Sequence, residues 1–146
     1  MRGNNVRRII VVLAVTSLLG GIVSSQMIEA PSGNLATQLA TAVTHAGFSA
    51  NAEAIEMATT HLGHVLNCIV GTGGEGFNAD WGNPCGSQGE GIINELASHP
   101  QAADLQALVE SARALAAQGV TQTSLVAVQT AAAGVAALLS VITGPG

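Results

Sequence analysis

The stretch HLGHVLNCIVG, residues 61–71, places two histidines and a cysteine at spacings typical of one face of an α-helix. His61 and His64 are three residues apart, so on a helix their Cβ atoms lie about 5–6 Å apart and both side chains can reach one ion. Met57 lies one turn before His61 and can share that ion. Imidazole and thioether ligands favour copper over magnesium or calcium. The sequence therefore predicts a metal site at Met57, His61 and His64, with copper as the first candidate.

Zinc is the second candidate, held by the two histidines and a carboxylate from another helix. Cys68 is seven residues from His61, which is about 10.5 Å along a helix axis, so the two are not expected to hold the same ion. His45 is expected about 13 Å or more from His61, because a hairpin that turns near residues 47–49 would place it opposite residues around 52. The sequence leaves the role of His99 open.

Motifs of other metal and catalytic sites are absent from the sequence. The histidine pair is not an H-E-x-x-H motif, which argues against a zinc hydrolase, and the chain has no Walker A or EF-hand loop. It also has no nucleophile elbow of the G-x-S-x-G type, so we expect no enzyme. Covalent haem would need C-x-x-C-H, which leaves non-covalent haem as a further ligand to consider. The alternative function is an interaction or structural module of the cell envelope, in which the histidines pack and cap helices.

Cys68 and Cys85 are the only two cysteines of the chain. An even number of cysteines in an exported protein favours a disulfide. A bridge that closes a loop of this length stabilises the fold by about 3 kcal/mol in chain-entropy terms. The alternative is a pair of free thiolates that bind a metal.

Residues 1–25 have the layout of a secretory signal peptide. They begin with three arginines, continue with an apolar run from Ile9 to Leu19, and end in small residues, with cleavage expected after Ser25. Residues 26–33 are predicted to form a linker. The apolar run is shorter than the ~20 residues that a spanning helix needs, although an uncleaved anchor is the alternative. The protein is therefore expected in the periplasm or outside the cell.

Charge narrows the choice of partners. The chain has four basic and nine acidic residues, and three of the basic residues precede Ser25. The remainder then has Arg113 as its only basic residue and a formal net charge of −8. Binding to nucleic acid or to an anionic membrane requires clusters of Lys and Arg. We expect neither partner once the leader is removed, whereas a homo-oligomer remains open.

Apolar periodicity predicts an all-α domain over residues 34–146, a small up-and-down bundle of four main helices. The helical stripes before and after residues 45–51 differ in phase by about 100°, which indicates a turn or sharp kink near Gly47 and Ser49. A single kinked helix is the alternative. Residues 71–91 are too rich in glycine for a regular element and form a long loop, which the disulfide would staple. A short helix is expected after Gly91.

Two further helices complete the predicted bundle. The first begins near Pro100 and ends at Gly119. The second covers about residues 122–143, of which 125–143 carry no charge and are long enough to span a membrane. Gln129, Thr130 and many alanines interrupt the apolar character of this segment. We therefore favour a central helix of a soluble bundle over a membrane span.

Overall fold

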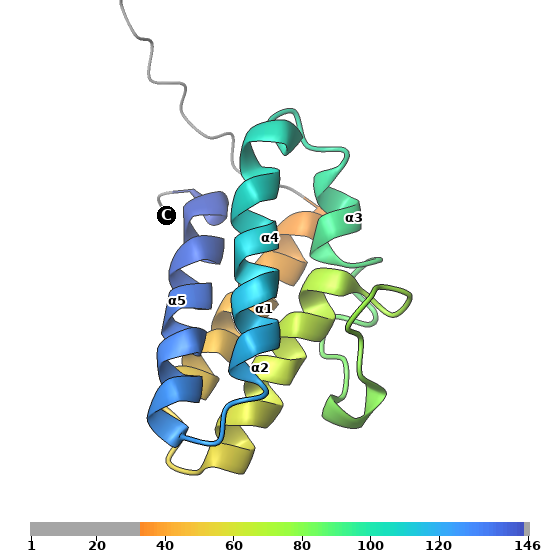
Figure 1. The fold of residues 1–146 in the computed structure, drawn as a ribbon. Coiled ribbons are helices and arrows are strands. Elements are labelled where there is room, and N and C mark those ends of the chain that lie inside the picture. The colour runs from red at the N-terminus through yellow and green to blue at the C-terminus, as the bar shows by residue number, and fades with distance from the viewer. Residues whose placement is uncertain (1–32, 145–146) are drawn as a thin grey trace, which may run out of the picture.

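The computed structural model describes residues 33–144, and four main helices pack up and down in it (Figure 1). These helices are α1 (Gly33–Ala50), α2 (Ile55–Val70), α4 (Ala102–Gly119) and α5 (Leu125–Thr143). A short helix, α3 (Ile92–Leu96), precedes α4. The predicted all-α bundle is confirmed. The predicted signal peptide and most of the predicted linker lie outside the described residues.

Residues 33–70 form two helices and not one kinked helix. The predicted break at Gly47 and Ser49 is wrong, because α1 continues through both residues to Ala50. Ser49 is fully buried and its hydroxyl donates a hydrogen bond of 2.7 Å to the carbonyl oxygen of Ala58 in α2. That bond fixes α1 against α2 next to the turn. The phase difference in the sequence arises from two separate helices whose connection is residues 51–54.

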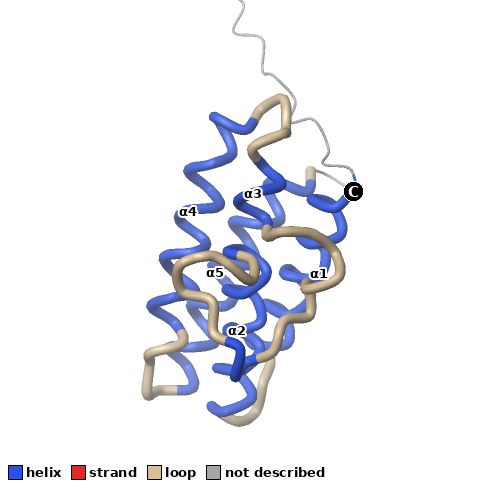
Figure 2. The backbone as a smooth tube through the Cα atoms, turned by 90° about the vertical axis from the view of Figure 1, so that its right-hand side faces the viewer, coloured by secondary structure: helices blue, strands red, loops and turns tan. Residues whose placement is uncertain are grey.

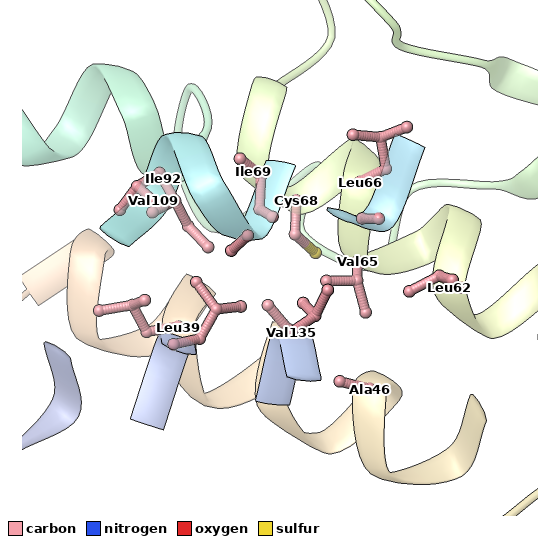
Figure 3. Packing of buried hydrophobic residues seen from close by; sticks show 14 of the residues in the cluster. Leu39, Ala46, Leu62, Val65, Leu66, Cys68, Ile69, Ile92, Val109 and Val135 are labelled. Atoms are coloured by element: carbon pink, nitrogen blue, oxygen red, sulfur yellow. The ribbon is translucent and has the colours of Figure 1, made fainter. Parts of the chain in front are cut away.

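Aliphatic side chains from all four main helices fill the core. Figure 3 shows Leu39, Val65, Val109 and Val135 meeting between the helices, and each is at most 1% exposed. The short helix α3 adds Ile92, which is also fully buried. Burial of side chains of this size stabilises the fold by about 1.5–3 kcal/mol each. The core therefore holds α1 and α2 in a fixed relative position.

Helix α5 packs against α1 and α4 within the bundle. By length and composition it is the one helix among residues 33–144 that is apolar enough to cross a membrane, and a third of that stretch is buried. Its side chains at Val128, Val135 and Leu139 are fully buried. Gln129 donates a hydrogen bond of 2.9 Å to the carbonyl oxygen of Ala52 in the α1–α2 turn. Helix α5 therefore takes part in the core that was expected for it.

The glycine-rich loop from Gly71 to Gly91 runs along the outside of the bundle as the long tan tube of Figure 2. It contains one turn of 3-10 helix, η1 (Ala79–Trp81). Cys68 at the end of α2 forms the predicted disulfide with Cys85 in the loop, with 5.2 Å between the Cα atoms. The loop is thus tied back to the helix that carries His61 and His64.

Candidate metal centre

Three histidines from two helices converge at the α1–α2 interface. His45 Nδ1 in α1 lies 3.1 Å from His61 Nδ1 and 3.1 Å from His64 Nδ1, both in α2. The ligand atoms of the three side chains all lie within 4.8 Å of one another. The rings of His45 and His64 meet edge to face, with 4.7 Å between their centroids. His45, His61 and His64 can therefore hold one metal ion.

The expectation that His45 lies about 13 Å from His61 is wrong. It assumed a hairpin turn near Gly47, whereas α1 ends at Ala50 and α2 begins at Ile55. In an antiparallel hairpin, residues at equal distances from the turn face each other. His45 is five residues before the end of α1 and His61 is six residues after the start of α2, so the two side chains meet.

A neutral imidazole nitrogen has one in-plane site, which holds either a proton or a lone pair. His45 Nδ1 has two nitrogen neighbours at 3.1 Å, so it can form one well-directed hydrogen bond with them and not two. A cation between the rings would accept a lone pair from each nitrogen. Around a tetrahedral ion with bonds of about 2.0–2.1 Å, ligand nitrogens lie about 3.3 Å apart. The two separations at His45 are close to that value.

The surroundings of His45 and His61 favour their neutral forms. Burial lowers the pKa of His45 from 6.5 to about 4, and the charges of His64 and His61 add to this effect. Burial also lowers the pKa of His61, with a second contribution from His64. A histidine must be deprotonated at the nitrogen that binds a metal. A lowered pKa therefore leaves the ligand ready to bind at neutral and mildly acidic pH.

The cluster lies at the surface and not in the core. All three histidines are half-buried, and Phe48, which is 52% exposed, packs beside them. The Phe48 ring centroid lies 5.6 Å from that of His45, edge to face, and 5.3 Å from that of His61. An ion held by these histidines would have the Phe48 ring nearby and would be accessible from solvent.

Loop residues form the wall of the site on the side of His64. The Trp81 ring lies on α2 at Gly63, where a Cβ would overlap the ring. A Cβ at Gly82 would lie 3.4 Å from His64 Nε2. The glycine between the two histidines, which the sequence presented only as a departure from a protease motif, is thus the place where the tryptophan packs on the helix.

The other predicted site residues have different surroundings. Met57 lies one turn before His61 and is 55% exposed, and its role as a ligand stays a prediction. The thiolate alternative for Cys68 and Cys85 is wrong, since both form the disulfide. His99 Nδ1 accepts a hydrogen bond from the backbone N–H of Gln101. Its segment, between α3 and α4, lies at the end of the bundle opposite the α1–α2 turn (Figure 1).

A carboxylate ligand from another helix is not part of the cluster, which among residues 33–144 consists of three histidines. The sequence signal for His45 as a third ligand was a histidine at a matching distance on the other side of the α1–α2 turn.

Comparison of the chain with models of protein families, with curated proteins and with solved structures gave no match. The function is therefore inferred from the chemistry and geometry of this chain.

Proposed function

We propose that this protein is an exported binding protein for a transition metal ion, copper or zinc, and that it stores, buffers or senses that ion outside the cytoplasm. The observation that carries the proposal is the convergence of three Nδ1 atoms, with two separations of 3.1 Å, from two helices that share one core. The hairpin fixes these atoms before the ion arrives, so binding requires little ordering of the chain.

The choice of ion follows from the donor atoms. Three imidazoles suit zinc, copper, iron and nickel, whereas magnesium and calcium prefer oxygen ligands. Among divalent ions, copper binds nitrogen sites most tightly and zinc follows the same chemistry at a lower affinity. Met57, if it turns toward the ion, adds a thioether that favours copper(I). Copper is therefore the first candidate and zinc the second.

The number of ligands supports exchange over permanent structural binding. Structural zinc sites are closed by four protein ligands, whereas sites with three protein ligands keep a position for water or another small ligand. The three histidines leave such a position, and all three are half-buried. An ion that reaches solvent in this way exchanges more readily, as storage, buffering and sensing require.

Two features support export to the periplasm or the exterior. Residues 1–25 have the layout of a signal peptide, and Cys68 and Cys85 form a disulfide. Disulfides persist in oxidising compartments and are rare in the cytosol.

The test is metal content per chain, measured by inductively coupled plasma mass spectrometry on untagged protein exported to the periplasm, followed by titration with copper and zinc. We expect about one ion per chain. His45→Ala removes the nitrogen that lies 3.1 Å from both others. It should lower the affinity by about 100-fold or more, since loss of even an outer-shell partner typically costs 10- to 100-fold.

His99→Ala is the matched control, since it removes a histidine at the opposite end of the bundle and should leave the stoichiometry at one. Circular dichroism must show the same helix content in all three proteins. A folded wild-type protein that stays empty after incubation with both metals would contradict the proposal. The histidines would then be packing residues of an interaction module.

A further inference from the structure

The loop segment from Asn78 to Gly82 forms the wall behind His64. The Nε2–Cδ2 edge of the His64 ring faces Gly82, since a Cβ placed on Gly82 would lie 3.4 Å from Nε2 and 3.9 Å from Cδ2. The opposite edge, with Nδ1, faces His45 Nδ1 at 3.1 Å. Gly82 has φ of +83°, a conformation that glycine adopts without strain, and it has no side chain to displace the ring. The backbone of this segment therefore lies beside the ring on the side away from the three Nδ1 atoms.

One buried side chain holds this wall in place. Asn67 Nδ2 donates hydrogen bonds to the carbonyl oxygens of Asn78, at 2.7 Å, and Gly82, at 2.6 Å. Asn67 Oδ1 accepts a bond of 2.9 Å from the backbone N–H of Asn78. The Asn67 side chain is fully buried, so the loss of these partners would leave its polar atoms without water to replace them. Both ends of the segment are thereby fixed to the helix turn that follows His64.

The segment behind His64 limits how far its ring can swing away from His45. A half-turn about the Cβ–Cγ bond leaves the outline of the ring nearly unchanged, so the segment acts on the rotations that move the whole ring. Such rotations bring Nε2 toward the ion in place of Nδ1. Side chains around a metal ligand commonly fix its orientation, and their loss typically lowers metal affinity 10- to 100-fold.

We propose that Asn67 is a positioning residue for the metal site: by holding Asn78–Gly82 against α2, it orients His64 so that Nδ1 faces the ion. This inference rests on the proposed function. Asn67 does not touch the ion, and its effect passes through the loop to His64. The amide is required, because a carboxylate at this position would place oxygen against two carbonyl oxygens.

The test is Asn67→Asp, which keeps the size of the side chain and removes both donors. Zinc titration should show an affinity 10- to 100-fold below wild type. NMR of ¹⁵N-labelled protein loaded with ¹¹³Cd then shows which nitrogen of His64 couples to the metal. In wild type we expect Nδ1 at His64, and in Asn67→Asp a loss of that coupling or a mixture with Nε2. A residue that only stabilised the fold would not change the identity of the bound nitrogen.

Asn94→Asp is the matched control, because Asn94 is exposed and its amide bonds only the nearby carbonyl of Glu90. Should Asn67→Asp fail to fold, Trp81→Ala loosens the same loop segment without burying a charge, and should lower the affinity several-fold. Wild-type affinity and Nδ1 coupling in either folded variant would overturn the inference, as would Nε2 coupling in wild type. Absence of zinc binding in wild type would instead refute the proposed function itself.

Discussion

The hairpin of α1 and α2 buries three polar side chains, Gln38, Ser49 and Asn67, whereas α4 and α5 bury none among the described residues. Each of the three donates a hydrogen bond that ties its helix to another segment or to its own turn. Every buried side-chain nitrogen and oxygen of the described chain has a partner. Directional bonds of this kind fix which residues face each other, as a site made from both helices requires.

The hairpin of α4 and α5 achieves close packing by different means. Gly119 in α4 touches Leu62 and Ala131, and a Cβ on Gly119 would overlap both side chains. Gly134 in α5 leaves room for Leu115 in the same way. Small residues bring these helices together without directional bonds, so this half contributes stability through burial. The two hairpins share one topology, and among residues 33–144 the histidine cluster that could hold a metal ion lies on the first.

The largest effect on stability is expected from a substitution in the α4–α5 hairpin. Leu139→Ala deletes a fully buried side chain of α5, and the cavity should lower the free energy of unfolding by about 2–5 kcal/mol. Urea denaturation measures this change. Metal affinity of the folded variant should equal that of wild type, and a parallel loss of binding would show that the two halves are not separable in this way.

The disulfide connects the histidine helix to the loop and should have the next largest effect. Replacing both Cys68 and Cys85 with serine should lower the free energy of unfolding by about 3 kcal/mol. Thermal unfolding of oxidised wild type, reduced wild type and the double variant distinguishes the effect of the missing disulfide from that of the cysteine-to-serine substitutions. Equal stability of the oxidised and reduced proteins would contradict the prediction.

Ser49→Ala tests how much one buried hydrogen bond contributes to the stability of the α1–α2 hairpin. It leaves the carbonyl oxygen of Ala58 without the hydroxyl donor that lies 2.7 Å away, which should cost about 1–3 kcal/mol. Thr130→Ala is the matched control, because that exposed hydroxyl bonds only the carbonyl of Val126 in its own helix. A control with the larger loss would count against a special role for polar contacts in the first hairpin.

Acid should destabilise the metal-free protein by a smaller amount. The pKa of His45 is lowered to about 4 in the folded protein from 6.5, so between these values the unfolded chain binds a proton that the native chain does not. The contribution of His45 to the free energy of unfolding is therefore fully present above pH 6.5, and it is lost as the pH falls toward 4. Urea denaturation at pH 7, 5.5 and 4 should show this decline, and His45→Gln should reduce its slope.

The sequence predicts the scaffold better than the site. Helical periodicity, the glycine-rich loop and the cysteine pair suffice to predict the bundle and its disulfide. Apolar burial and chain entropy depend on residue type and spacing, which the sequence gives directly. His61 and His64 were found because three-residue spacing on one helix is local. The position of His45 was predicted wrongly because it depends on where α1 ends, and α1 continues through Gly47 and Ser49 to Ala50. Asn67 gave no signal, since its three partners belong to an irregular loop.

Trp81 is the only tryptophan of the chain, and its ring lies on α2 at Gly63, between the two histidines of that helix. The protein thus contains one indole fluorophore, and this fluorophore lies next to the proposed metal site. Paramagnetic copper(II) at the site should quench its emission strongly, whereas closed-shell zinc should shift it only slightly. Tryptophan fluorescence then reports both the occupancy of the site and the identity of the bound ion, without an added label.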